Sequence, residues 1–487
     1  MAAQHDALSG PVTCIRNAAW IIGWDAAAGS HVYLRSGDVA WQGDRLVTVG
    51  GRHEGAAHTE IDGTARLVMP GLINIHCHPT QTPVFRGMVE EFGNPRLFYS
   101  SRHRFRQSFV QDEAALLVAA RYGLAEMLAC GTTSIVDLSH AYPGWIDLLA
   151  ESGLRAWAGA MFRSARWHTD TGQDILLDWA PDLGAAAFDE ARDVMDAAEA
   201  HPCGRLTGLV TPAQVNTCTP DLLRAAAALA RDTGRTLHTH GAQSYAEFNA
   251  MARLHDCTPV EYLGGLGFLG PRTIIGHAVF TDEHPWLVWP RRADLRLLAE
   301  SGTSVAHCPT VFARDGTMMH HLGAYMDAGV NIAIGTDTHP QNLFQEMQLA
   351  ETIARLAAGP QHACSTARVF HACTIGAAQV LGRDDIGRLA PGAKADVVVA
   401  DLDEFNMRPV RDPLRSMIYS SVGRSVRDVW VDGVQRVAAG RVMSIDMAAA
   451  AAALQREQDR ITASTPDIES TAPLALPLAG APVPRIG

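Results

Sequence analysis

Apolar, strand-like runs alternate with Ala- and Leu-rich helical stretches through the middle of the chain. The helix-like stretch AALLVAARYGLAEMLAC precedes the run 132–138, and DLLRAAAALARDTG precedes the run 235–240. This alternation requires a parallel sheet with crossover helices. Repeated units of this length predict an α/β fold in which residues 67–386 form a (β/α)8 TIM-like barrel. An open doubly wound sheet is the alternative, but no glycine-rich phosphate loop supports it.

Both ends of the chain have a different sequence pattern. They consist of short runs of β-branched and aromatic residues separated by turn-forming residues. These runs fill residues 12–51 and return at residues 387–443. The pattern is typical of small all-β units. We therefore expect residues 1–66 and 387–445 to pair into one composite β-sandwich domain. Residues 446–487 predict a helix followed by a Pro-rich tail, either mobile or lying on a neighbouring subunit.

Composition narrows the class of function. The 487 residues carry a net charge of −12, which argues against nucleic acid or an anionic membrane as the main partner. The nine cysteines include no CxxC pair, and we find neither a signal peptide nor an apolar run of about 18 residues. We expect a cytoplasmic protein that acts on a small molecule and forms a homodimer or a higher homo-oligomer.

Histidine and aspartate residues end several of the predicted strands. His76 and His78 point to the same face of one strand, although two such histidines are more often packed or surface groups. His240, His277 and Asp337 each close a further apolar run. The C-terminal ends of barrel strands meet at one mouth, so these side chains become neighbours. Three imidazoles and one carboxylate, with room for water, predict an open catalytic site for Zn²⁺ or a similar divalent ion.

Several motifs, in this order and at this spacing, resemble the metal-dependent amidohydrolase superfamily. The similarity lies in the branch that includes triazine hydrolases and cytosine, guanine and methylthioadenosine deaminases, and it covers nearly the whole chain. The motifs are Met69–Asn74 before His76-x-His78, Phe85-Arg86-Gly87, Glu126–Thr133 with Asp137, His238-Thr239-His240, Gly276-His277, Ala306–Pro309, Gly335-Thr336-Asp337 and Gly387–Asp396.

The resemblance implies a single divalent ion bound by His76, His78, His240 and Asp337, with His277 beside the metal-bound water. Zinc is the first expectation, and iron, cobalt or manganese are alternatives. A divalent ion can lower the pKa of bound water to about 7, and Asp337 or His277 can then accept the proton and pass it to the leaving group. His238 is an alternative third ligand. No strand-end lysine is present to bridge two metals.

Two departures from the pattern bear on the substrate. Deaminating relatives carry Glu three residues after the third histidine, whereas this chain has Gln243, which cannot shuttle a proton. Their Pro-His after the fourth strand reads Pro212-Ala213-Gln214 here. We therefore expect hydrolysis of an amide-, urea- or carbamate-like C–N bond, with Gln243 orienting a carbonyl group and Gln214 as a substrate contact.

Two alternatives remain open for the function. One is deamination or dechlorination of a nitrogen heterocycle such as a purine, a pyrimidine or an s-triazine. The other is a non-catalytic ligand-binding barrel, although every expected ligand is present. Arg86 and His307 are further candidates for substrate contacts. A solvated loop charge and a histidine packed inside the barrel are the respective structural explanations.

Overall fold

The structure, a computed structural model, describes residues 10–87, 93–94, 99–100, 111–168, 176–358 and 364–464. The predicted Pro-rich tail, from residue 465 onward, lies outside the described residues, as do residues 1–9. Within the described part, no helix is both long enough and apolar enough to cross a bilayer.

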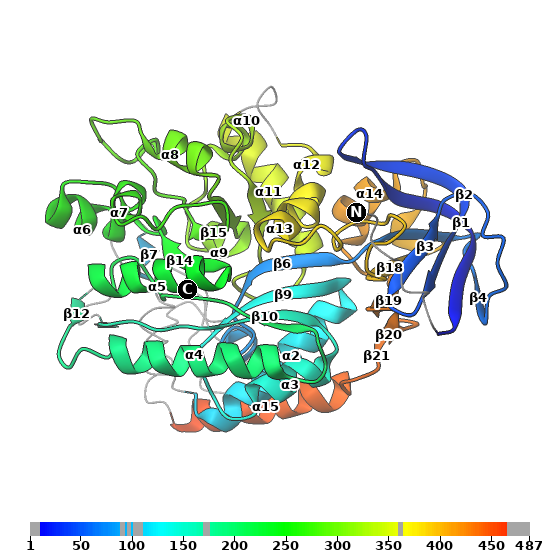
Figure 1. Cartoon of the computed structure of the whole chain (residues 1–487), viewed down its shortest axis with the longest axis horizontal. Helices are drawn as coiled ribbons and strands as arrows, with labels where there is room; N and C mark the ends of the chain where they lie inside the picture. Colours follow the sequence, from blue (N-terminus) through cyan, green and yellow to red (C-terminus); the bar gives the residue numbers. More distant parts are fainter. Residues whose placement is uncertain are drawn as a thin grey trace, which may run out of the picture.

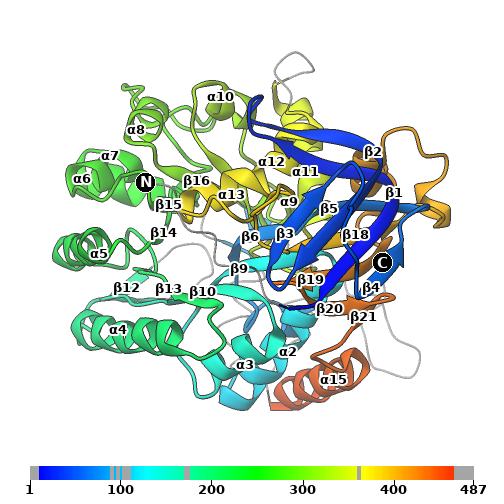
Figure 2. The same ribbon diagram turned by 45° about the vertical axis from the view of Figure 1, so that its right-hand side comes forward.

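Strands from both ends of the chain share one nine-stranded sheet within the described residues, in the order β21-β20-β19-β18-β5-β1-β2-β3, with β4 paired to β1. The central junction is antiparallel and places Pro70 of β5 opposite Val397 of β18. Figure 2 shows this sheet on one side of the molecule. Its strands are β1 (Val12–Asp25), β2 (Ser30–Gln42), β3 (Arg45–Val49), β4 (Thr59–Asp62), β5 (Arg66–Pro70), β18 (Val397–Asp401), β19 (Val426–Val431), β20 (Val434–Ala438) and β21 (Arg441–Val442).

The middle of the chain forms two four-stranded parallel sheets, in the orders β13-β10-β9-β6 and β14-β15-β16-β17. Figure 1 shows these strands inside the molecule, with α2, α3 and α4 below them and α8, α10 and α12 above. The fold is therefore mixed α/β, as the sequence predicts. The strands are β6 (Leu72–Cys77), β9 (Thr132–Ser139), β10 (Arg155–Ala160), β13 (Leu206–Gly208), β14 (Leu237–Gly241), β15 (Thr273–His277), β16 (Ser304–His307) and β17 (Ile332–Ile334).

The two parallel sheets touch along both of their edges. On one side, isolated parallel bridges join Val210 to Leu237 and Gln214 to His240. On the other side, the backbone N–H of Asp337 donates to the carbonyl oxygen of His76 at 3.0 Å. These contacts bring the C-terminal ends of β6, β14 and β17 to one side of the strands.

Helices connect the parallel strands and pack against them. Each strand of the two parallel sheets after β6 is preceded by at least one helix, for example β10 by α3 and β13 by α4. The helices are η1 (Pro83–Phe85), α2 (Glu113–Ala129), α3 (Trp145–Ser152), α4 (Gly184–Ala200), α5 (Pro220–Thr233), α6 (Tyr245–His255), α7 (Pro259–Gly265), α8 (Asp294–Ser301), α9 (Pro309–Arg314), α10 (Leu322–Asp327), α11 (Leu343–Ala358), α12 (Thr366–Ala372), α13 (Ile375–Val380), η3 (Phe405–Met407), α14 (Pro413–Ser416), η4 (Met417–Ser421) and α15 (Met447–Ser464).

Two short strand pairs lie outside these sheets and complete the inventory of elements in the described residues. They are β7 (Gly93–Asn94) with β8 (Tyr99–Ser100), and β11 (Arg166–His168) with β12 (Leu176–Asp178).

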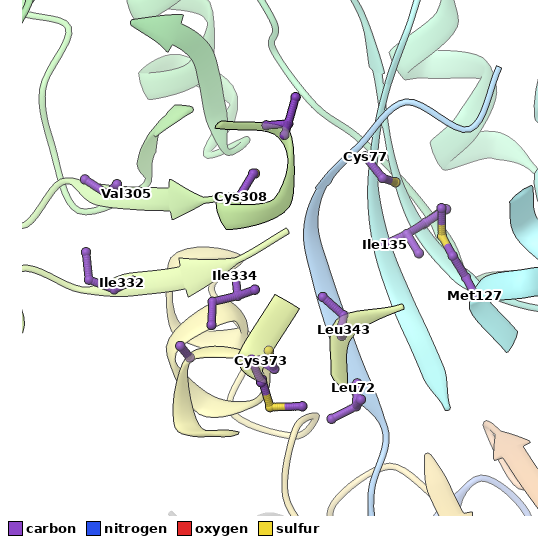
Figure 3. Close-up of a cluster of buried hydrophobic side chains, with 14 of the residues drawn as sticks. Leu72, Cys77, Met127, Ile135, Val305, Cys308, Ile332, Ile334, Leu343 and Cys373 are labelled. Atoms are coloured by element: carbon purple, nitrogen blue, oxygen red, sulfur yellow. The ribbon is translucent and has the colours of Figure 1, made fainter. Parts of the chain in front are cut away.

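The largest core cluster fills the space around the parallel strands and under the helices. Figure 3 shows part of it, with Leu72 of β6, Ile135 of β9, Ile334 of β17 and Leu343 of α11, all fully buried. Cys77 lies in the same cluster. Burial of this apolar surface fixes the strands whose ends carry the site.

Candidate metal centre

Five of the predicted polar side chains come together at the ends of the parallel strands. The Nε2 atom of His78 lies 3.2 Å from Oδ1 of Asp337 and 3.4 Å from Nε2 of His240. The Nε2 atom of His76 lies 3.5 Å from the same carboxylate oxygen, and that of His277 lies 3.8 Å from Oδ2. Ligand atoms of His76, His78 and His240 all lie within 4.8 Å of one another.

The backbone that presents these groups is unusual at two of them. His277 and Asp337 have positive φ angles of 87° and 53°. Residues with a side chain seldom adopt this left-handed region, which costs of order 1 kcal/mol each, and it persists where the surrounding structure imposes it. At the ends of β15 and β17, this conformation accompanies side chains that lie against the other histidines.

Hydrogen bonds set the tautomers of two of the histidines. The Nδ1 atoms of His78 and His240 lie 2.6 Å from the carbonyl oxygens of Leu138 and Ala213. Because a carbonyl only accepts, each Nδ1 carries the proton and each Nε2 presents a lone pair. These two lone pairs face each other, and Nε2 of the buried His76 has no hydrogen-bond partner among the described residues. A cation shared by the three nitrogens satisfies all of them, so the residues fit a divalent ion.

His238 lies behind the cluster. Its Nε2 atom is 3.1 Å from Nδ1 of His76, and the residue is fully buried. The contact orients the His76 imidazole so that its other nitrogen faces Asp337. His238 is absent from the groups of ligand atoms that could hold an ion, whereas His240 belongs to one of them.

The charges of the cluster are those that a cation requires. Burial lowers the pKa values of His76 and His277 to about 3, so both imidazoles are neutral at pH 7. Burial alone would raise the pKa of Asp337, but the contacts with His76 and His78 outweigh it and hold the pKa well below its usual range. Cys308 lies near Asp337, but burial raises the pKa of its thiol well above the ordinary value. The site therefore presents neutral nitrogens, one carboxylate and a neutral thiol.

The predicted substrate contacts have different surroundings. Gln214 is the bridge partner of His240 and is half-buried, as is Gln243. His307 ends β16, is buried, and has its pKa lowered by burial to about 4. Arg86 donates to both carboxylate oxygens of Glu126 at 2.5 Å. The guanidinium group of Arg86 is therefore paired with a carboxylate of α2.

Sequence reasoning missed Glu247, a fully buried carboxylate at the start of α6. Its Oε1 accepts a hydrogen bond from the backbone N–H of Ala242 at 2.6 Å, and its Oε2 lies 3.5 Å from Nε2 of Gln214. Burial raises the pKa of Glu247 to about 7. The spacing from Ser244, which caps α6, matches a Ser-x-x-Glu helix start. That signal could have located the glutamate, but not its burial.

Comparison with known proteins identifies the family of this chain. The family model for the amidohydrolase family matches residues 67–436, which is most of the chain. The chain belongs to the amidohydrolase family. Membership confirms the predicted class of enzyme, a hydrolase that acts on carbon–nitrogen bonds.

Curated relatives of this amidohydrolase align over most of their length. The chain is 30% identical over 403 residues to a 5-methylthioadenosine/S-adenosylhomocysteine deaminase of Halobacterium salinarum, covering 81% of this chain and 86% of the relative. It is 30% identical over 433 residues to a protein of the same name from Nitratidesulfovibrio vulgaris, covering 87% and 91%.

Solved structures share the fold of this amidohydrolase. An adenosine deaminase from Xanthomonas campestris with bound zinc has a TM-score of 0.78 and 24% identity, covering 93% of this chain and 98% of that one. An atrazine chlorohydrolase from Arthrobacter aurescens complexed with zinc has a TM-score of 0.74 and 24% identity, covering 93% and 100%.

Proposed function

We propose that this amidohydrolase is a zinc-dependent aminohydrolase that releases ammonia from an aminated nitrogen heterocycle, with a purine nucleoside as the first substrate to test. The contacts among His76, His78, His240 and Asp337 support the metal-dependent part of the proposal. The substrate class is supported by the deaminase relatives, which align over more than four fifths of this chain. The sequence alone favours hydrolysis of an amide, urea or carbamate and leaves ring deamination as the alternative.

In this proposal the four ligands hold one divalent ion, and zinc is favoured because two similar structures contain it. When bound, such an ion lowers the pKa of water and so supplies a nucleophile at neutral pH. His78 and His240 donate through Nδ1 to backbone carbonyls, which fixes the orientation of both rings. The contact between Nε2 of His238 and Nδ1 of His76 orients the third ring.

Proton transfer falls to Asp337 and His277. Asp337 is ionised and His277 is neutral, and the closest of their polar atoms are 3.8 Å apart. Both groups can therefore accept a proton from water at the mouth and pass it to the leaving amine. Gln243, three residues after His240, can hold a substrate by hydrogen bonds but cannot supply a proton.

Hydrolysis of an amide, urea or carbamate is the second candidate, and Gln243 is the observation that favours it. A side-chain amide suits a substrate whose carbonyl group needs only a hydrogen-bond partner. In that case Gln214 and His307 line the site as contacts for the acyl or amine part of the substrate.

The test begins with metal analysis of the purified protein, followed by assays of ammonia and amine release. The panel contains adenosine, 5-methylthioadenosine, S-adenosylhomocysteine, a chlorotriazine and a phenylurea. We expect about one equivalent of zinc, loss of activity after chelation, and ammonia release from an adenine nucleoside. Release of aniline from the phenylurea, without ammonia from any ring, would establish the second candidate instead.

A variant separates the two candidates further. Gln243→Glu introduces an acid that can protonate a ring nitrogen, so it should raise kcat for ring deamination by about tenfold or more. Gln243→Leu is the matched control, because it removes the hydrogen bonds without adding an acid. An unchanged ring-deamination rate in Gln243→Glu, measured beside Gln243→Leu, would remove this residue from the choice of reaction.

We also propose a fuller description of the molecule. The contacts along both edges of the two parallel sheets support one closed (β/α)8 barrel over residues 67–386. The shared terminal sheet supports a composite domain of residues 1–66 and 387–445, for which a β-sandwich remains a prediction. All nine cysteines are free, which supports a cytoplasmic location. A homodimer or larger assembly is testable by analytical ultracentrifugation.

A further inference from the structure

A chain of buried polar side chains crosses the junction between β6 and β17, where no strand ladder joins the two sheets in the described part of the chain. Asn74 of β6 and Thr336, just after β17, bond to each other twice. The side-chain Nδ2 of Asn74 donates to Oγ1 of Thr336 at 2.9 Å, and its Oδ1 accepts from the backbone N–H of Thr336 at 3.1 Å. Both residues are fully buried.

Gln341 extends this chain and is itself fully buried. Its Oε1 accepts from the hydroxyl of Thr336 at 2.5 Å, and its Nε2 donates to the hydroxyl oxygen of Thr82 at 2.8 Å. Its backbone N–H donates to Oε2 of Glu126 at 2.8 Å, and Glu126 is held in turn by Arg86. One side chain therefore joins the segment after β17 to the segment after β6.

Both ends of this connection lead directly to metal ligands. Thr336 immediately precedes Asp337, whose backbone N–H donates to the carbonyl oxygen of His76 at 3.0 Å. The hydroxyl of Thr82 donates to the carbonyl oxygen of His78 at 3.3 Å. A shift of Gln341 would therefore change the separation between Asp337 and the pair formed by His76 of β6 and His78 just after it.

The hydrogen-bond roles explain why this position needs an amide. The single hydroxyl proton of Thr82 is used on His78, so its oxygen needs a donor. The hydroxyl of Thr336 accepts from Asn74, so its proton needs an acceptor. The side chain of Gln341 offers one donor and one acceptor at once, whereas a carboxylate in its place would offer only acceptors.

We propose that Gln341 is a positioning residue that sets the distance between Asp337 and the His76/His78 pair and thereby the affinity of the site for its divalent ion. The proposal rests on the metal-dependent function proposed above. It also gives Arg86 a role: the guanidinium holds Glu126 where its carboxylate can accept the backbone N–H of Gln341.

The test compares three variants of the full-length protein. Gln341→Met removes both side-chain hydrogen bonds at similar volume, and Gln341→Glu keeps the acceptor but loses the donor to Thr82. The control is Asn331→Leu, because Asn331 lies just before β17 and also makes two hydrogen bonds through its side chain, to Ser304 at 2.8 Å and to Gly376 at 2.9 Å. Asn331 lies before the N-terminal end of β17, whereas Asp337 lies after its C-terminal end.

Three quantities are measured for each protein: the Kd for Co²⁺ by chelator competition, the visible absorption of bound Co²⁺, and the urea midpoint of the metal-free protein. We expect Gln341→Met and Gln341→Glu to weaken Co²⁺ binding about 10- to 100-fold and to alter the absorption bands. Asn331→Leu should lower the urea midpoint but keep the Kd within about threefold and leave the absorption unchanged, because its hydrogen bonds lie away from the ligands.

The outcomes distinguish this inference from the function on which it rests. Wild-type affinity and absorption in both Gln341 variants would overturn the positioning role alone. Equal losses of Co²⁺ affinity in the Gln341 variants and in Asn331→Leu would show that the hydrogen-bond network has only a structural role. That result would also overturn the positioning role of Gln341. Failure of the wild-type protein to bind Co²⁺ would overturn the proposed function together with it. If Gln341→Met does not fold, Thr82→Val removes the same link and must weaken binding.

Discussion

Glu247 shows how one buried side chain can shape the pH response of this protein. Its carboxylate is enclosed between the turn after β14 and Gln214, and it accepts a hydrogen bond from Ala242. Burial penalises the charged form more than these hydrogen bonds favour it, so the pKa rises from 4.5 to about 7. The folded protein therefore holds a proton here that the unfolded chain releases.

The sign of the resulting effect follows from proton linkage. Between pH 4.5 and about 7 the folded state binds more protons at Glu247 than the unfolded state, so the free energy of unfolding falls as the pH rises. A shift of this size corresponds to about 3 kcal/mol. Glu247→Gln removes this dependence. Between pH 4.5 and pH 8, the free energy of unfolding of the variant should therefore rise by about 3 kcal/mol relative to that of the wild-type protein.

Urea unfolding of the metal-free proteins at several pH values measures this difference. The comparison of wild-type and variant protein cancels the other titrating groups. A constant difference across the range would show that folding does not raise the pKa of Glu247.

Sequence reasoning predicted which polar side chains come together better than it predicted their neighbours. His76, His240, His277 and Asp337 all end apolar runs, and parallel strands bring such ends together. The partners of Arg86 could not be predicted, because Glu126 lies on a helix 40 residues further along the chain and either residue could have faced solvent. Pairings of this kind depend on how a helix packs, which local patterns do not encode.

At the scale of elements, the junction of β6 and β17 has no space for extra atoms. A Cβ atom added at Gly335, just after β17, would lie 2.6 Å from the backbone oxygen of His76 and 2.7 Å from its backbone nitrogen. Backbone atoms cannot move aside as the end of a flexible side chain can. The absence of a side chain at Gly335 is therefore what lets Asp337 approach β6.

Gly335→Ala should lower the free energy of unfolding by about 1–3 kcal/mol or more, since overpacking displaces the backbone. The same displacement should weaken Co²⁺ binding, because the carboxylate of Asp337 moves with the strand end. Gly265→Ala is the control, since a Cβ at Gly265 in α7 would meet no atom within 4 Å. Urea unfolding and chelator competition measure both effects. Equal behaviour of the two variants would contradict the tight junction.

The sequence predicted the parallel strands but not how the two sheets join. Apolar runs identify β14 to β17, and a histidine or an aspartate lies at the end of each run or within a few residues of it. Short bridges such as Gln214 to His240, and the side-chain network around Gln341, depend on contacts between residues far apart in the chain. No local pattern distinguishes such a junction from an ordinary loop.

At the scale of the whole molecule, a buried cation connects the parallel strands to the terminal sheet. Arg155, the first residue of β10, lies 3.2 Å from the carboxylate of Asp396 and 2.6 Å from that of Asp432. The side chains of Arg155 and Asp396 are 3% and 2% exposed, so the ion pair is shielded from water. Asp396 immediately precedes β18 and Asp432 immediately follows β19. The ion pairs therefore connect the parallel strand β10 to the terminal sheet.

Arg155→Met should cost about 3–5 kcal/mol of unfolding free energy, because it leaves two carboxylates buried without their partner. Arg121→Met is the matched control: its ion pair with Glu151 is 40% and 47% exposed, and the expected loss is below about 1 kcal/mol. Urea unfolding compares the two. Similar losses in both variants would show that the Arg155 contact adds little to the attachment of the terminal sheet.

The shared sheet also has a consequence for how the protein is made. When β5 leaves the ribosome, its partner β18 is more than 300 residues away and not yet synthesised. At about 5–20 residues per second, this edge of β5 stays uncovered for tens of seconds. During that interval the nascent chain exposes an unpaired strand edge to every other chain nearby, so newborn molecules should depend on chaperones far more than the finished enzyme does.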